Sequence, residues 1–189
     1  MNPQEITLTT RTGMSLYQAH RAIYEIMREQ DNPQAERDFL FEYDPLSGLT
    51  YVRTSRPREA LGAWSPVPVP QAGQTYNVSG RMAIQRCKSR YTLKPTSRGP
   101  IDWMQPAWLQ ERISSKLSAC GTIERVQAKT TAPVLFDKPG SHGMLVTPIT
   151  FTARMRVDDP QAAADLLDKG MGWLRGFGFG VMTFAPETA

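Results

Sequence analysis

Histidine and cysteine are scarce in this chain of 189 residues, which contains only His20, His142, Cys87 and Cys120. The two cysteines have neither metal-site nor redox-motif spacing, so they disfavour a zinc module and a disulfide scaffold and agree with a reducing compartment. No apolar run reaches the length that spans a bilayer, and no basic segment followed by an apolar core opens the chain. We therefore expect a cytoplasmic protein without membrane contact.

Acidic residues are absent from the whole interval between Glu59 and Asp102, although the net charge of the chain is only +4. The interval carries six cations, namely Arg81, Arg86, Lys88, Arg90, Lys94 and Arg98. Six cations without a counter-charge favour contact with the phosphates of a polyanion. A solvated strand face followed by a linker would explain the same residues, so both explanations stay open.

Glycine is concentrated in one place, the run 170–180, which holds five glycines and the cation Arg175. Successive backbone amides in such a loop can form an anion-binding hollow, which makes Arg175, Gly176 and Gly178 candidate phosphate contacts. The run is neither a Walker loop nor a dinucleotide loop, because a helix is expected before it (160–169) and a strand after it (178–184). A tight turn whose glycines serve packing is the alternative.

Hydrophobic spacing predicts alternating strands and helices, which is typical of an α+β protein. Strands are expected at 5–10, 38–43, 49–53, 74–85, 123–127, 134–136, 144–157 and 178–184, with 90–93 as a further candidate. Helices are expected at 16–28, 57–63, 106–119 and 160–169. Pro66, Pro68 and Pro70 interrupt the chain before the strand at 74–85, which we assign to the end of a first βαββαβ-like unit. The pattern alone leaves the number of such units open.

The first helix carries the residues most suited to chemistry. His20 follows Tyr17 by three positions and precedes Tyr24 by four, so the three side chains share one helix face, flanked by Arg21 and Arg28. A histidine can exchange a proton near neutral pH, a tyrosine hydroxyl can orient a phosphate or ribose, and arginines can hold the phosphate. An ordinary core or surface histidine beside a packed tyrosine is the plain alternative.

Several of these segments resemble one known family. The glycine run matches the glycine-rich signature of the repeat-associated RAMP proteins of CRISPR systems. Ser15–His20 and Arg37–Phe41 look like the N-terminal region of the CasE family, CRISPR RNA endonucleases of the Cascade complex, and Ala107–Gln110 and Phe151–Pro186 also resemble it. The resemblance implies two tandem ferredoxin-like (RRM-like) units, at 1–88 with the catalytic helix and at 89–189 with a basic hairpin and the glycine-rich loop.

The resemblance also implies an activity. His20 falls on the family's general acid/base histidine and Tyr17 on its assisting tyrosine, which implies cleavage of CRISPR repeat RNA by attack of a ribose 2′-hydroxyl, without metal or other cofactor. The implied partners are the folded repeat hairpin and other subunits of a Cascade-like complex, in which the product stays bound. The full set of expected RNA contacts is Arg21, Arg28, Arg81, Arg86, Lys88, Arg90, Arg125, Lys129, Lys138, Arg175, Gly176 and Gly178.

Two other functions remain compatible with these observations. One is a non-catalytic RNA-binding subunit with the same fold, and the other is an unrelated α+β module whose glycines only serve packing. The presence of both Tyr17 and His20 favours the enzyme over the first, and the basic interval without acids argues against the second. A third catalytic group is undetermined, since position 25, where some relatives have a basic residue, holds Glu25.

Overall fold

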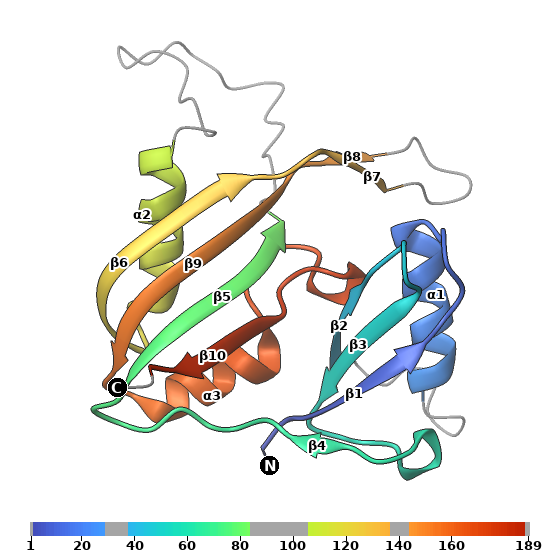
Figure 1. Ribbon diagram of the computed structural model, residues 1–189, viewed down its shortest axis with the longest axis horizontal. Helices are drawn as coiled ribbons and strands as arrows, with labels where there is room; N and C mark the ends of the chain where they lie inside the picture. Colours follow the sequence, from blue (N-terminus) through green and yellow to red (C-terminus); the bar gives the residue numbers. More distant parts are fainter. Residues whose placement is uncertain (1, 29–37, 84–105, 137–143, 188–189) are drawn as a thin grey trace, which may run out of the picture.

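A computed structural model describes residues 2–28, 38–83, 106–136 and 144–187 of the chain. Two four-stranded antiparallel sheets form the body of the molecule, and a two-stranded hairpin projects from the second sheet (Figure 1). Helices lie on the sheets, so the α+β class with two ferredoxin-like units in tandem is confirmed.

The first sheet has the strand order β2-β3-β1-β4, in which every pairing is antiparallel. Its elements are β1 (Gln4–Thr9), α1 (Leu16–Met27), β2 (Phe39–Tyr43), β3 (Leu49–Thr54), the 3₁₀-helix η1 (Glu59–Leu61) and β4 (Ser65–Pro66). The short η1 stands where a ferredoxin-like unit would have its second helix. The second helix of this unit is therefore reduced to one short 3₁₀ turn, and α1 is its one long helix among the described residues.

Helix α1 begins at a complete capping box. The Ser15 hydroxyl accepts a hydrogen bond from the Gln18 amide at 3.2 Å, and the Gln18 side chain accepts one from the Ser15 amide at 2.9 Å. Two backbone donors that the helix would leave unsatisfied are thereby paired. The buried residues then recur at helical spacing along one stripe, which faces the first sheet and the glycine-rich loop. That stripe consists of Leu16, Ala19, His20, Ile23 and Met27.

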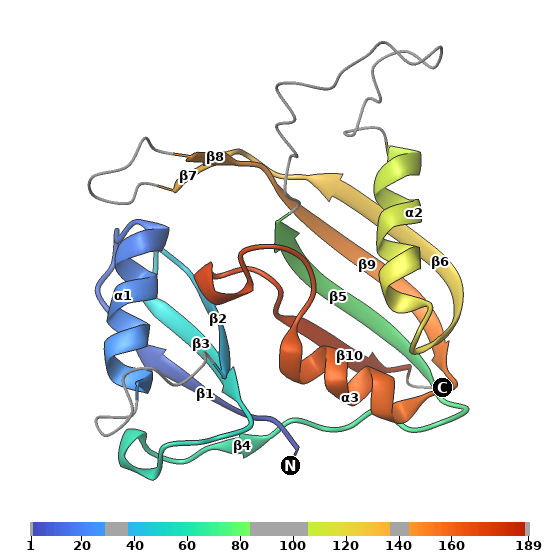
Figure 2. The same cartoon turned by 180° about the vertical axis from the view of Figure 1, so that it is seen from behind.

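The second sheet has the order β10-β5-β9-β6, the arrangement of a full βαββαβ unit. Its elements are β5 (Thr75–Ala83), α2 (Pro106–Leu117), β6 (Gly121–Thr130), β9 (Pro148–Val157), α3 (Pro160–Lys169), the 3₁₀-helix η2 (Arg175–Phe177) and β10 (Met182–Pro186). Helices α2 and α3 both lie on one face, as the view from behind shows (Figure 2). The hairpin β7 (Val134–Phe136) and β8 (Met144–Val146) continues from β6 and β9 toward α1.

Two expectations about strands need correction. Strand β5 does not close the first unit, because it pairs along its whole length with β9, from Thr75 opposite Arg156 to Ala83 opposite Pro148. The unit boundary expected at residue 88 lies outside the described residues and stays a prediction. The last strand starts at Met182 and not at Gly178, because Gly178 and Gly180 have φ angles of 86° and 95°, which strands do not adopt.

Candidate active site and nucleic-acid surface

His20, on α1 of the first unit, is hydrogen-bonded to a residue of the second unit. Its side chain is only 5 % exposed, and its Nδ1 lies 2.6 Å from the carbonyl oxygen of Gly176 in η2, 156 residues further along the chain. Because a carbonyl oxygen only accepts hydrogen bonds, Nδ1 must carry the donated proton. A neutral ring that donates from Nδ1 carries its lone pair on Nε2.

Aromatic rings from α1, η2 and β2 surround this histidine, and the ring from β2 is Phe41 at 6.4 Å. Tyr17 and Tyr24 of α1 lie with ring centroids 6.4 and 6.1 Å from His20, as their helical spacing indicated. Phe177 of η2 is nearest, at 4.1 Å. Phe136 of β7 contacts both Phe177, at 4.7 Å, and Tyr17, at 5.9 Å, in edge-to-face geometry. The site therefore joins α1, the glycine-rich loop and the base of the hairpin.

Sequence reasoning did not identify Phe136 and Phe177 as parts of this cluster. Phe177 lies inside the glycine run, which is a signal for the loop but not for a contact with His20. Phe136 ends a short apolar strand and carries no signal of its own. His142, the other histidine, lies outside the described residues.

The glycine-rich loop has the left-handed backbone that its composition predicted, with one exception. Gly170, Gly172, Gly178 and Gly180 have φ angles between 69° and 95°, whereas Gly176 lies in the turn of η2 and offers its carbonyl to His20. A side chain at Gly180 would come within 2.9 Å of the Met171 carbonyl oxygen. Packing against the protein therefore accounts for part of the glycine requirement, and the anion hollow remains a prediction.

The arginines near the helix and the loop have different surroundings. Arg28, at the end of α1, forms an exposed ion pair with Glu25 at 3.2 Å. Arg175 donates from Nη1 to the Lys169 carbonyl oxygen at 2.8 Å, so it caps the C-terminus of α3. Arg21 is exposed on α1 and makes no ion pair in the part of the chain that the structure describes. Their contacts with RNA remain predictions.

Three further expected RNA contacts lie on the second sheet. Arg81 projects from β5, with its guanidinium carbon 5.2 Å from the centre of the Phe179 ring, and Arg125 and Lys129 are exposed on β6. The remaining expected contacts, Arg86, Lys88, Arg90 and Lys138, lie outside the described residues.

Residues that suit a metal or a thiol mechanism are not assembled in the described part of the chain. Within it, no three histidine, cysteine or acidic side chains gather where they could hold a metal ion. Burial raises the pKa of the Cys120 thiol to about 11, so this group is a poor nucleophile. Cys87 lies outside the described residues. None of the described helices has the length and apolar character needed to cross a membrane.

The fold and the site together define a class: tandem ferredoxin-like proteins in which a histidine-bearing helix of the first unit meets a glycine-rich loop of the second. The family model described as "CRISPR associated protein" matches residues 2–186. The chain belongs to this family of CRISPR-associated proteins.

Individual relatives cover nearly the whole chain. The CRISPR system Cascade subunit CasE of Escherichia coli K12 is 24 % identical over 96 % of this chain and 98 % of its own length. The crystal structure of Cas6e from the same strain matches with a TM-score of 0.68 at 21 % identity, covering 99 % of this chain and all of the other. The CRISPR endoribonuclease Cse3, solved bound to a 19-nucleotide RNA, matches with a TM-score of 0.63 at 19 % identity over 98 % of this chain and all of its own.

Proposed function

We propose that this protein is an endoribonuclease that cuts CRISPR precursor RNA within its folded repeat, without a metal ion. The observation that carries the proposal is the hydrogen bond between His20 and the Gly176 carbonyl, which fixes the ring and directs its chemistry to Nε2. Membership of the CRISPR-associated family and the likeness to CasE and to the endoribonuclease Cse3 support the choice of substrate.

The reaction uses a nucleophile that the RNA itself provides. The 2′-oxygen next to the scissile phosphate attacks phosphorus in line, its proton passes to a base, and the bond from phosphorus to the 5′-oxygen breaks. The leaving 5′-oxygen takes up a proton, so the products are a 2′,3′-cyclic phosphate and a 5′-hydroxyl. Nε2 of His20 is placed to act as the general acid or base, a role that contributes about 10²–10⁴-fold in rate.

Tyr17 and the nearby arginines supply orientation and charge in this scheme. Tyr17 borders His20 and Phe136, so its hydroxyl can position a phosphate or ribose where α1 meets the hairpin. Arg21 is exposed on the same helix and can hold a phosphate oxygen. Positioning the 2′-hydroxyl in line with the leaving oxygen provides much of the remaining acceleration.

The product is proposed to stay bound and to enter a Cascade-like ribonucleoprotein. The relatives carry this part of the proposal, since one is named as a Cascade subunit and another matching chain comes from a CRISPR RNA-guided surveillance complex. The expected recognition is of A-form shape, through contacts with phosphates and 2′-hydroxyls of the repeat stem.

Cleavage of the cognate repeat RNA in the presence of EDTA tests the proposal directly. We expect the wild-type protein to cut under these conditions and His20→Ala to be slower by about 10²-fold or more while it still binds. His142→Ala, which changes the other histidine, is the matched control and is expected to cut normally. Undiminished cleavage by His20→Ala, or a requirement for divalent metal, contradicts the mechanism.

One observation favours a second candidate, the non-catalytic RNA-binding subunit. His20 is 5 % exposed beneath neighbouring rings, which is the environment of a structural histidine as well as of a covered catalytic one. Under this alternative the wild-type protein binds the repeat hairpin but leaves it intact. The same cleavage assay therefore separates the two candidates.

A further inference from the structure

The second sheet has one covered and one open face. Helices α2 and α3 cover the first, where Leu109, Ile113 and Ala163 pack into the core with side chains of β5 and β9. The opposite face looks toward the viewer in Figure 1; Ser79, Gln127 and Thr152 are exposed on it, and Phe179 of the glycine-rich loop lies against Arg81 at its edge. This open face belongs to the same unit as the hairpin and the glycine-rich loop, so its chemistry bears on what the protein binds.

Strand register shows which side chains share the open face. Residues directly opposite one another in antiparallel strands lie on the same side of the sheet. Thr150 of β9 stands opposite Lys129 on one side and Arg81 on the other. In the next row, Thr152 stands between Gln127 and Ser79. This end of the face, nearest the hairpin, consists of Ser79, Arg81, Gln127, Lys129, Thr150 and Thr152.

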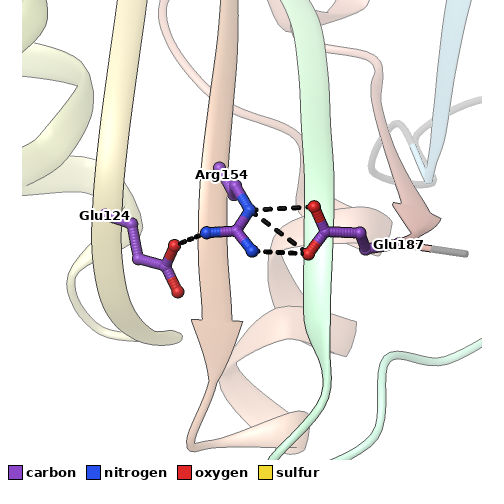
Figure 3. Close-up of polar contacts among 3 residues, drawn as sticks. All are labelled: Glu124, Arg154 and Glu187. Carbon is purple, nitrogen blue, oxygen red and sulfur yellow. Dashed lines mark hydrogen bonds and ion pairs between the residues drawn. The ribbon is translucent and has the colours of Figure 1, made fainter. Parts of the chain in front are cut away.

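The charges on the face are neutralised at one end only. Away from the hairpin, Arg154 lies between Glu124 and Glu187, with 2.7 Å from its Nη2 to a Glu187 oxygen (Figure 3). Arg156 in the same region pairs with Asp158 at 3.1 Å.

The cations nearer the hairpin have no such partners. Within the described residues, Arg81 and Lys129 form no ion pair. The face is therefore polarised, with uncompensated positive charge beside the hairpin.

The chemistry of the basic end suits the backbone of a nucleic acid. Its side chains offer ammonium and guanidinium groups, hydroxyls and an amide, but no aromatic ring on which a base would stack. A hollow of about 480 Å³ is lined by Gln127, Lys129, Thr150 and Thr152, and also by Gln110 of α2 and by Ala128 and Phe151 of the helix-covered core. The Thr150 hydroxyl is buried there without a hydrogen-bond partner among the described residues. Phosphates and 2′-hydroxyls match these groups, and such contacts do not depend on base sequence.

We infer that the basic end of this open face binds the single-stranded RNA that flanks the folded repeat, through its sugar–phosphate backbone. The inference rests on the proposed function, which places the repeat at α1 and the hairpin. The hairpin strands β7 and β8 continue directly from β6 and β9 (Figure 1). The single-stranded flank of an RNA bound at this hairpin therefore passes onto the sheet beside Lys129 and Arg81. A contact that ignores base identity accepts a flank of any sequence.

The test compares two RNAs with the same protein. Fluorescence anisotropy measures the affinity for an uncleavable 2′-deoxy repeat hairpin and for the same hairpin extended by about ten nucleotides, a typical single-strand site size. The ratio of the two affinities reports the flank alone. We expect a ratio well above one in the wild type, equal for two flanks of unrelated sequence. The flank should also steepen the log–log salt dependence.

Charge-matched variants then locate the contact. Arg81→Gln/Lys129→Gln is expected to bring the ratio close to one and to reduce the flank's contribution to the salt slope by about 1.4, at about 0.7 per cation. Arg112→Gln/Lys116→Gln removes the same charge from exposed positions of α2 on the other side of the sheet, and is expected to keep the wild-type ratio. Lys129→Gln alone, at an exposed position, should lose about half of the effect and guards against misfolding of the double variant.

The outcomes distinguish this inference from the proposed function. If the wild type neither binds nor cuts the hairpin, the proposed function fails first. If the hairpin is bound and cut but the flank adds no affinity, the inference is wrong. An unchanged ratio in Arg81→Gln/Lys129→Gln, with both affinities reduced together, would place these residues on the stem and also overturn it. If Arg112→Gln/Lys116→Gln lowers the affinity ratio as much as Arg81→Gln/Lys129→Gln does, the effect comes from the overall charge of the protein. That result would also overturn the inference.

Discussion

Arg53 provides the most direct test of how the two units are held together. This residue of β3 is 2 % exposed, and its Nη1 donates a hydrogen bond to the carbonyl oxygen of Met182, the first residue of β10, at 2.6 Å. Its Nη2 donates to the Tyr51 hydroxyl at 2.8 Å and lies 3.3 Å from a Glu5 carboxylate oxygen. Burial lowers the pKa of the guanidinium, and Glu5 opposes this shift by stabilising its charge. Replacing Arg53 therefore removes a buried cation that links the first sheet to the second.

The expected magnitude follows from what each partner loses. A buried acceptor left without its donor costs about 1–3 kcal/mol, which applies to the Met182 carbonyl. Glu5 remains 29 % exposed, so water replaces part of its lost interaction. We expect Arg53→Ala to lower the free energy of unfolding by about 3 kcal/mol, at the low end for breaking a buried ion pair. At about 2–4 °C per kcal/mol for a chain of this size, the melting temperature falls by about 6–12 °C.

Urea denaturation and thermal melting measure this loss. Arg53→Met, which keeps most of the buried volume, is expected to lose less, about 1–2 kcal/mol. Arg156→Ala is the control, because it breaks an exposed ion pair with Asp158 and should unfold close to the wild type. If Arg53→Ala unfolds within about 0.5 kcal/mol of the wild type, the guanidinium does not stabilise the contact between the sheets.

Three further predictions follow from the site. A repeat RNA lacking the 2′-hydroxyl upstream of the scissile phosphate should still bind but not be cut; efficient cutting would indicate an activated water and a missed metal site. Arg175→Ala should weaken repeat binding and flatten its log–log salt dependence by about one unit. If binding is unchanged across the salt titration, Arg175 does not contact the RNA and its role is to cap the C-terminus of α3. Burial raises the pKa of the Cys120 thiol to about 11. In a Cys87→Ser variant at about pH 8, a thiol reagent should therefore modify Cys120 slowly in the folded protein and quickly in denaturant. Fast labelling of the folded protein would contradict the burial of this thiol.

Local signals in the sequence predicted the helices well. Ser15 and the apolar spacing after it placed α1 within one residue of its observed end, and Pro160–Lys169 is observed as a helix over the same bounds. Strand partners were harder, because alternation shows which residues share a face but not which strand lies alongside. This is why β5 was assigned to the first unit although its long pairing is with β9.

Contacts within α1 and contacts with distant segments differ in the same way. The neighbours of His20 on α1, Tyr17 and Tyr24, follow from helical spacing. The Gly176 carbonyl and Phe136 do not, because contacts between distant segments leave no local pattern. Sequence reasoning left the burial of His20 open between core and surface, although His20 stands next to Ala19 and three positions before Ile23 on the apolar stripe of the helix.

Two hydrogen bonds between the units fall on either side of the same short segment. The His20 ring holds the Gly176 carbonyl, and Arg53 holds the Met182 carbonyl six residues later. Between them, Gly178 and Gly180 have left-handed backbone, and a side chain at Gly180 would also come within 2.9 Å of the Met171 carbonyl oxygen. The position of the glycine-rich loop is therefore set from both sheets at once. Because the same loop carries the acceptor that fixes the His20 tautomer, the packing between the units and the proton chemistry proposed for α1 depend on one another.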